Sequence, residues 1–139
     1  MLKLNQSELR IEEAKIENGE EEVIVANQSD LFLNNLQIQN TTSNYSLLEI
    51  SGSVLNFANS TVQQNYVGSA VMTLSNVNAT IFQSVFKDNT NLIGSGTNTM
   101  KVNGSSQIDV TYSNFDTLNF LKSERINGTY IKVEEAGEV

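Results

Sequence analysis

Four residue types are missing from the sequence: cysteine, histidine, proline and tryptophan. A chain without cysteine forms no disulfide and offers no cysteine-based metal or redox site. A chain without histidine lacks the most common general base and metal ligand. We therefore expect no bound metal, no cofactor and no catalytic residues.

Positive charge is also scarce, because eight lysines and arginines stand against sixteen acids and give a net charge of −8. Nucleic acids and anionic membranes are bound through clustered lysine and arginine, so neither is an expected partner. No apolar run is long enough to insert into a bilayer, and residues 1–5 do not have the pattern of a signal peptide. We expect a chain that stays where it is made, or a piece of a longer extracellular or cell-surface protein.

The charges that are present lie mostly at the two ends of the chain. Residues 1–30 contain eight acids and three bases, and residues 121–139 contain four acids and three bases. The ninety residues between them hold four acids and two bases and are rich in Asn, Ser and Thr. Charged ends protect the open edges of a sheet. This contrast favours the hypothesis of a natural segment fitted with engineered caps, or of a wholly designed protein.

One spacing of apolar residues repeats along the chain: apolar, x, apolar, x, x, small or apolar, x, apolar. It occurs five times, beginning at Leu9, Leu31, Leu55, Ala79 and Ile108, with starts 22, 24, 24 and 29 residues apart. Period-two apolar pairs accompany these copies: Val23/Val25, Leu48/Ile50, Met72/Leu74, Met100/Val102 and Ile131/Val133. Pairs with period two are typical of strands with one inward face.

The repeat predicts that like residues of successive coils lie above one another. The first inward column contains Ile11, Leu33, Phe57, Ile81 and Val110; the second contains Ile16, Ile38, Val62, Phe86 and Phe115; the third contains Val25, Ile50, Leu74, Val102 and Val133. The outward column beside the third contains Ile24, Glu49, Thr73, Lys101 and Lys132. Asn, Ser and Gly between the strands suit turns with a left-handed backbone.

The predicted fold is all-β: a right-handed, single-stranded parallel β-helix, or β-solenoid, of about five coils. It forms one domain, residues 1–139, in which residues 1–28 are the N-terminal capping coil, residues 29–115 the repeat coils and residues 116–139 the C-terminal coil and cap. An antiparallel β-sandwich also has short alternating strands and is the alternative. It explains neither the constant step of five or six residues between each apolar pair and the next repeat nor the small residue inside four of the five repeats (Ala14, Ser60, Ser84 and Ser113).

Two segments carry a family resemblance. Residues 59–65 (NSTVQQN) and 83–89 (QSVFKDN) resemble the small-x-Phe-x-x-Asn repeat of right-handed β-helix surface proteins, of which polymorphic outer-membrane adhesins are the best-known group. Residues 68–71 (GSAV) resemble the Gly-Gly-Ala-Ile stretch of the same repeats, and pectate-lyase-like β-helices share the stacking. The resemblance covers roughly residues 29–120 and implies a β-helix that serves adhesion or surface display.

Asparagine occurs in eight Asn-x-Ser/Thr triplets. In a protein secreted by a eukaryote these triplets accept glycans, and the candidate sites are Asn40, Asn44, Asn59 and Asn78. The alternative is that the triplets arise because the turns of a solenoid need Asn, Ser and Thr. We also expect Asn18, Asn40, Asn65 and Asn89, which follow inward strands, to stack as an amide ladder.

The connection that follows the third inward position of each coil lengthens along the chain, from 7 residues after Ile16 to 16 after Phe115. Insertions along one edge of a solenoid often carry binding. The candidate binding loops are residues 87–99 and 116–130. The candidate contact residues are Tyr66, Asn91, Leu92, Asn119 and Phe120. The alternative is that apolar residues between 118 and 126 fold over the end as a cap.

The same loops hold Asp88 and Asp116, the two acids that the repeat brings nearest to each other. Two acids with lysine nearby are a poor set for the Ca²⁺ or paired-carboxylate chemistry of β-helix lyases and hydrolases. The sequence therefore predicts a non-catalytic structural or adhesive module, either part of a cell-surface protein or a capped scaffold. Its expected partners are a surface glycan, a protein or a second copy stacked end to end. A carbohydrate-binding or carbohydrate-degrading β-helix fragment is the alternative.

Overall fold

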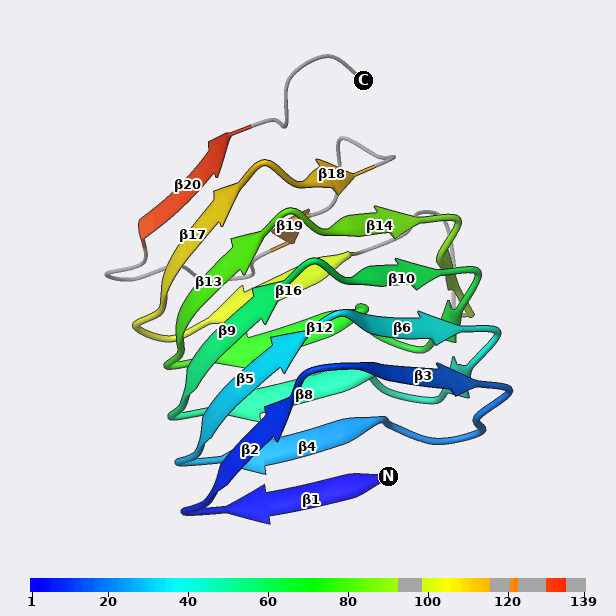
Figure 1. Cartoon of the computed structure of the whole chain (residues 1–139), viewed down its shortest axis with the longest axis horizontal. Coiled ribbons are helices and arrows are strands. Elements are labelled where there is room, and N and C mark those ends of the chain that lie inside the picture. Colours follow the sequence, from blue (N-terminus) through cyan, green and yellow to red (C-terminus); the bar gives the residue numbers. More distant parts are fainter. Residues whose placement is uncertain (93–98, 116–120, 123–129, 135–139) are drawn as a thin grey trace.

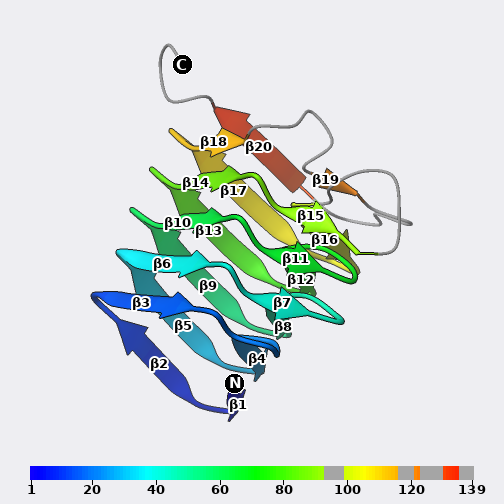
Figure 2. The same ribbon diagram turned by 90° about the vertical axis from the view of Figure 1, so that its right-hand side faces the viewer.

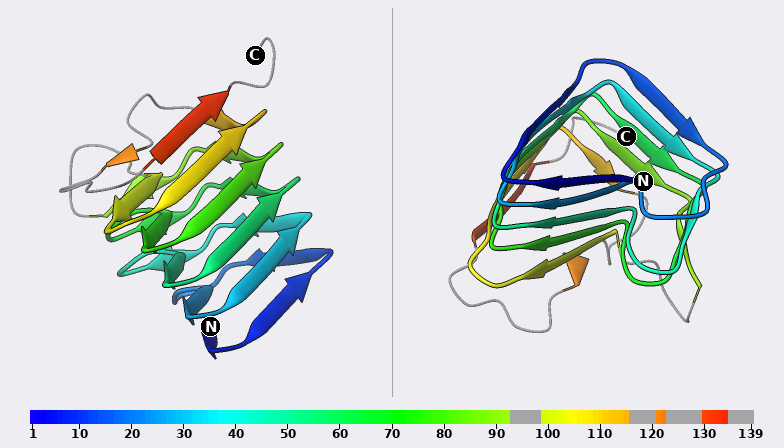
Figure 3. Two further views of the ribbon diagram at one scale, coloured as in Figure 1. Left: turned by 90° about the vertical axis from the view of Figure 1, so that its left-hand side faces the viewer. Right: turned by 90° about the horizontal axis from the view of Figure 1, so that it is seen from below.

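The computed structural model is built from parallel strands that stack coil upon coil (Figure 1). It describes residues 1–92, 99–115, 121–122 and 130–134. Within these ranges all regular elements are strands, and they wind as a β-solenoid of about four turns, close to the five coils predicted. Viewed from the N-terminal end, the coils follow nearly the same outline (Figure 3). The all-β parallel solenoid is thereby confirmed, and its right-handed sense stays a prediction.

The strands form four parallel sheets, here named A to D. Sheet A contains β1 (Leu2–Asn5), β4 (Ile24–Asn27), β8 (Leu48–Ser51), β12 (Met72–Ser75), β16 (Met100–Asn103) and β19 (Leu121–Lys122). Sheet B contains β2 (Glu8–Ile11), β5 (Asp30–Asn34), β9 (Val54–Ala58), β13 (Asn78–Phe82), β17 (Gln107–Thr111) and β20 (Tyr130–Glu134). Sheet C contains β3 (Ala14–Glu17), β6 (Leu36–Gln39), β10 (Thr61–Gln63), β14 (Val85–Lys87) and β18 (Asn114–Phe115). Sheet D contains β7 (Thr42–Ser43), β11 (Tyr66–Val67) and β15 (Thr90–Asn91).

The strand register reproduces the offsets of the sequence repeat. Leu9, Leu31, Leu55, Ala79 and Ile108 are successive ladder partners in sheet B. The first predicted column, from Ile11 to Val110, is confirmed in the same sheet. The second column, from Ile16 to Phe115, is confirmed in sheet C. Parallel coils therefore place like side chains in layers.

These columns fill the interior of the solenoid. Leu33, Phe57, Ile81 and Val110 are almost fully buried, and the Phe57 ring lies 5.7 Å from the ring of Phe86 between centroids, in stacked geometry. Removing a side chain of this size from water stabilises the fold by about 1.5–3 kcal/mol. The core is thus a continuous apolar stack between the sheets rather than a channel.

The third predicted column is wrong at both ends. In the second coil Ile24 and Ala26 are buried, whereas Val25 pairs with Glu49 on the outer face of sheet A. Residues 23–26 are all apolar, so alternation gave no information about which side chains face inward. At the other end Val133 pairs with Val110 in sheet B, because β19 supplies the sheet A strand of that coil. Lys132 accordingly pairs with Asp109, not with Lys101.

The chain turns at three corners, and each corner is a column of residues with positive φ. In the part of the chain that the structure describes, all thirteen such residues lie in these columns. Gln6, Gln28, Gly52, Asn76 and Gly104 lie between sheets A and B; Asn35, Asn59, Gln83 and Tyr112 lie between sheets B and C; Asn18, Asn40, Gln64 and Asp88 follow sheet C. Asparagine and glycine, which adopt this left-handed backbone most readily, fill seven of these thirteen positions, and glutamine fills four.

The residue after each left-handed position is commonly small, polar and buried, and its side chain completes the hydrogen bonding of the corner. Ser60 Oγ accepts the N–H of Leu36 (3.0 Å) and donates to the carbonyl of Ala58 (2.7 Å). Ser84 and Ser113 repeat this arrangement one coil further each time. A buried N–H without a partner is costly, so these serines are structural.

The corner after sheet C uses an amide ladder in which Asn65 and Asn89 take part as predicted. Asn65 Oδ1 accepts the N–H of Thr41 (2.9 Å), and Asn89 Oδ1 accepts the N–H of Asn65 (3.2 Å). The prediction was wrong for Asn18 and Asn40. Both occupy the left-handed position itself, which lies two residues after the last inward residue in all four of these coils, and the ladder position that follows is Gly19 in the first coil and Thr41 in the second.

Candidate functional site

The three short strands of sheet D and the residues just after them form the edge where exposed large side chains gather. We name Thr42, Tyr45, Tyr66, Thr90 and Leu92 the sheet D ridge. Tyr45 is 60 % exposed, Tyr66 49 % and Leu92 48 %. Figure 2 shows β7, β11 and β15 side by side along this edge. Large exposed side chains that are grouped in this way often mark a contact surface.

Strand alternation sets the outward face of the ridge. Tyr66 pairs with Thr42 on one side and with Thr90 on the other, and all three side chains are exposed. The next residues, Ser43 and Val67, face inward and are fully buried. Tyr66 is therefore flanked by two threonines on the outer face, and the buried side chain of Val67 anchors its strand in the core.

The backbone around Tyr45 is held by the next coil. The carbonyl of Tyr45 accepts the N–H groups of Gly68 and Ser69, both at 3.1 Å. A side chain at Gly68 would overlap the Asn44 carbonyl oxygen, so only glycine permits this approach. Ser43 Oγ accepts the N–H of Tyr45 (3.1 Å). The backbone of Tyr45 is thus fixed, while its ring is free to contact a partner.

A small polar cluster supports this loop from inside. Ser43 Oγ donates to the carbonyl of Ser46 (3.2 Å), and the hydroxyls of Ser46 and Thr73 share a hydrogen bond of 2.7 Å. Ser43 and Ser46 are fully buried. A buried network of this kind stiffens the backbone that carries it. A rigid aromatic residue loses little entropy when it binds.

The structure brings together three of the predicted contact residues. Tyr66, Asn91 and Leu92 lie on neighbouring coils of sheet D, with Asn91 paired to Val67. Asn91 is half-buried, and its Nδ2 donates to the carbonyl of Ser69 (2.7 Å), so its amide holds the loop. Asn119 and Phe120 lie outside the described residues. Sequence reasoning missed Tyr45, Thr42 and Thr90, although counting 24 residues either way from Tyr66 leads to the two threonines.

The four candidate glycosylation sites, Asn40, Asn44, Asn59 and Asn78, are all exposed. Asn40 and Asn59 occupy left-handed corner positions, and Asn59 Nδ2 donates to Asn34 Oδ1 (2.7 Å). These two asparagines therefore have a role in the turns. Glycan attachment at any of the four stays a prediction.

The electrostatics of the described residues centre on the first coil. Arg10 pairs with Glu12 and Lys15 with Glu17, each at 3.0 Å and on the surface. Hydrogen bonds from Lys15 and Gln39, together with the charge of Lys15, lower the pKa of the Glu17 carboxyl. Asp88 lies exposed at a corner, and its predicted neighbour Asp116 is outside the described residues. Among the described residues, no three acids gather as metal ligands, and no helix is long and apolar enough to cross a membrane.

Two other aromatic residues at the surface, Tyr112 and Phe32, have a ring or a cation as partner. Tyr112 contacts Phe82 edge to face, with ring centroids 5.8 Å apart. The Arg10 guanidinium lies 4.8 Å from the centroid of the Phe32 ring. Tyr45 and Tyr66 have no such ring or cation partner within the described ranges. Of these aromatic side chains, the two ridge tyrosines are thus the ones open to a ligand.

Comparison with known proteins gives no match to a family model, to a curated protein or to a solved structure.

Proposed function

We propose that the protein is a non-catalytic structural module that attaches to a surface ligand through the sheet D ridge. The observation that carries the proposal is that Tyr66 lies on the outer face of sheet D, while Tyr45 and Leu92 follow its strands β7 and β15 by two residues and one residue, and each of the three is about half exposed or more. Aromatic residues of this kind supply much of the binding energy at protein interfaces.

The rest of the solenoid supports a scaffolding role. Side chains on its outer faces bond mainly to their own neighbours along the stack, as in Gln63 to Gln39 (3.3 Å) and Gln39 to Glu17 (3.0 Å). Asn27 likewise bonds to Asn5 (3.1 Å). Side chains that are engaged in this way have less capacity for a ligand. The sheet D ridge differs because its large side chains do not take part in such hydrogen bonds between coils.

A carbohydrate ligand is the second candidate, and one observation favours it. Tyr66 lies between Thr42 and Thr90, so an apolar ring face is flanked by two hydroxyl groups. A ring face packs against the apolar side of a sugar, while hydroxyls exchange hydrogen bonds with its edge. This alternative includes a carbohydrate-degrading fragment, which would need acids or a metal in addition.

The test is binding to a glycan array and to immobilised extracellular proteins, with Tyr66→Ala and Tyr45→Ala as ridge variants. The matched control is Tyr112→Asn, which changes a tyrosine of similar exposure (53 %) on another face. We expect each ridge variant to weaken binding roughly tenfold or more, about 1.4 kcal/mol, and the control to bind like the unmodified chain.

Four results would decide between the candidates. Binding to a protein but not to glycans, lost in the ridge variants, supports adhesion to protein. Glycan binding with the same loss supports the carbohydrate alternative, and Ca²⁺-dependent cleavage of a polysaccharide would overturn the non-catalytic assignment. Equal loss in Tyr112→Asn would show that the ridge is not the binding surface.

A further inference from the structure

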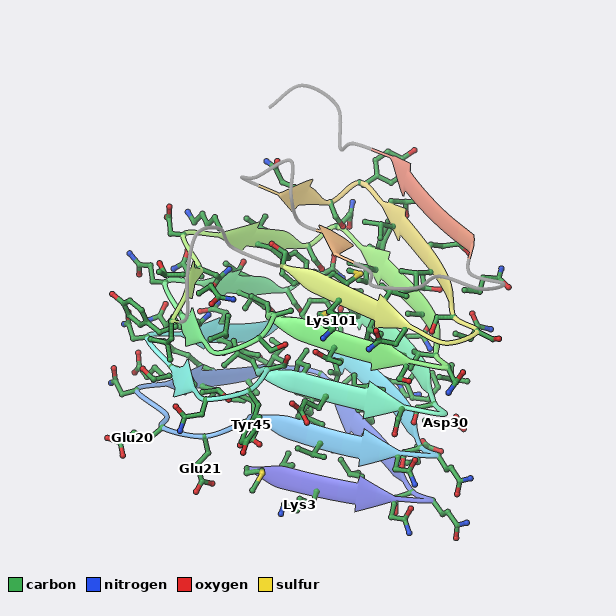
Figure 4. The ribbon with its side chains drawn as sticks, turned by 180° about the vertical axis from the view of Figure 1, so that it is seen from behind. Lys3, Glu20, Glu21, Asp30, Tyr45 and Lys101 are labelled. Atoms are coloured by element: carbon green, nitrogen blue, oxygen red, sulfur yellow. The ribbon has the colours of Figure 1, made fainter. Side chains whose placement is uncertain are left out.

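The outward row of sheet D continues into the first coil, where an acid occupies it. The Thr42 N–H donates to the Gly19 carbonyl (2.9 Å), just as the Tyr66 N–H donates to the Thr41 carbonyl (2.9 Å). Because Tyr66 is the ladder partner of Thr42, the same bonding places Glu20 opposite Thr42. Glu20 is exposed, and Figure 4 shows its side chain pointing away from the stack. Glu20 therefore lies in one outward row with Thr42 and Tyr66.

The loop that carries Tyr45 is longer than the matching segment of the first coil. The Val23 N–H donates to the Leu47 carbonyl (2.8 Å). Residues 20–22, all glutamate, therefore cover in the first coil the stretch that residues 42–46 cover in the second. The two additional residues make the second loop bulge outward, and Tyr45 within it is 60 % exposed. The Tyr45 ring thus projects in the coil next to these glutamates.

Another acid follows Tyr45 on its other side along the chain. Glu49 is the second residue of β8 and lies on the outer face of sheet A. Its Oε1 accepts the N–H of Ser46 (3.4 Å), so this carboxyl group faces the end of the Tyr45 loop. Among the described residues, neither Glu20 nor Glu49 forms an ion pair. The exposed Tyr45 ring is therefore accompanied by acids whose charge no base of the described chain neutralises.

The opposite end of the sheet D ridge has no such excess of acids. Lys87 and Asp88 are the charged residues nearest in sequence to Thr90 and Leu92, and their charges offset each other. Leu92 itself is 48 % exposed. The ridge therefore has an acidic end at Tyr45 and an apolar end at Leu92.

We propose that the ligand of the sheet D ridge is a protein segment in which a lysine or arginine lies near an apolar or aromatic side chain. This inference rests on the proposed attachment through the ridge and names the chemistry of the partner. The basic side chain lies against the Tyr45 ring, where the ring face and the carboxylates of Glu20 and Glu49 attract a cation. The apolar side chain contacts Tyr66 and Leu92.

Charge argues against the other ligands. An acidic glycan is repelled by Glu20 and Glu49 and by the net charge of −8. A neutral glycan gains nothing from the two carboxylates, and a second copy of this chain has the same excess of acids. A basic protein segment is attracted before contact and is favoured over acidic competitors.

The test is an NMR titration of the whole chain with three short peptides of equal length. Each peptide carries a tryptophan, and three residues away a lysine, a glutamine or a glutamate. Three extended residues span about 10 Å, as do the two strand spacings that separate Tyr66 from Glu20. We expect the lysine peptide to bind roughly fivefold more tightly than the glutamine peptide, and the glutamate peptide to bind most weakly. Added salt should reduce these differences.

The variants separate local charge from net charge. Glu20→Gln/Glu49→Gln should abolish the preference for lysine and leave the glutamine peptide unaffected, and glutamine at position 49 keeps an oxygen acceptor for the loop. The matched control Glu13→Gln/Asp109→Asn removes as many charges away from the ridge and should keep the preference. Tyr45→Leu should reduce the preference, whereas Tyr45→Phe, which retains a ring, should keep it.

The outcomes distinguish this inference from the proposed function. Equal binding of the lysine and glutamine peptides, with both weakened by Tyr66→Ala, would overturn the basic partner and leave the ridge as the attachment surface. Lysine-peptide binding that Tyr66→Ala does not weaken would contradict both. Absence of binding by every peptide, or loss of the lysine preference in the control, would also overturn the inference. Shift changes at Tyr45 and Tyr66 with a lysine preference that only Glu20→Gln/Glu49→Gln and Tyr45→Leu reduce would support it.

Discussion

The first coil and the middle coils share one backbone path and differ in what fills and flanks it. In the middle coils the inward columns are fully buried and the corners are completed by buried serine and asparagine side chains. In the first coil the same columns are half-exposed, and glutamates replace much of the Asn, Ser and Thr. The repeat spacing therefore sets the backbone path of a coil, whereas the burial of its core residues and its corner hydrogen bonds depend on the coils stacked on both sides.

The largest expected difference lies in the core, where Leu9 and Leu31 are direct ladder partners of the same residue type. Leu31 is fully buried and Leu9 is half-buried. We expect Leu31→Ala to lower the free energy of unfolding by about 2–5 kcal/mol and Leu9→Ala by about 1 kcal/mol. Urea unfolding followed by circular dichroism measures both. Equal losses would mean that the first coil is as closely packed as the second.

A smaller difference is expected in the amide ladder. Asn65 accepts the N–H of Thr41 and donates from Nδ2 to the carbonyl of Ile38 (3.1 Å), so Asn65→Ala removes two buried hydrogen bonds. We expect a loss of about 2–3 kcal/mol in unfolding free energy. Thr41→Val removes longer bonds, to Gly19 (3.4 Å) and Gln39 (3.2 Å), and should cost about 1 kcal/mol. A larger loss of unfolding free energy in Thr41→Val than in Asn65→Ala, in the same assay, would contradict this.

The smallest effect concerns Glu17 on the surface of the first coil. Because its pKa is lowered in the folded state, its contribution is present above the ordinary carboxyl pKa of the unfolded chain. That contribution is lost as the pH falls through the lowered folded value. Glu17→Gln should therefore lose less stability than the unmodified chain on acidification, by a small margin because solvent screens this exposed group. Urea midpoints between about pH 5 and pH 3 measure this, with Glu13→Gln as control. Identical pH profiles for the unmodified chain and Glu17→Gln would contradict it.

The parallel stack and two of its three inward columns could be predicted from the sequence, because alternation and a constant offset leave one arrangement of Leu33, Phe57 and Ile81. Alternation failed at Val25, where apolar residues occupy both faces, and at Val133, where β19 is only two residues long. Sheet D was missed for the same reason, since its strands have two residues each. The sequence singled out Tyr66 because it lies in the connection that lengthens from coil to coil. Tyr45 was not, because its position depends on the close approach of Gly68 in the next coil.

The central claim is that successive coils pair in parallel at the offsets of the sequence repeat, and cysteine crosslinking tests it directly because the chain has no cysteine of its own. Val54 and Asn78 are ladder partners on the outer face of sheet B, as are Asn56 and Thr80. Neighbouring strands lie about 4.8 Å apart, within the range that a disulfide spans. We predict that paired cysteines at 54 and 78, or at 56 and 80, form an intramolecular disulfide under mild oxidation, detected by mass, while the pair 54 and 82 does not. Crosslinking of 54 with 82 in place of 54 with 78 would mean antiparallel neighbours and would contradict the stacked parallel coil.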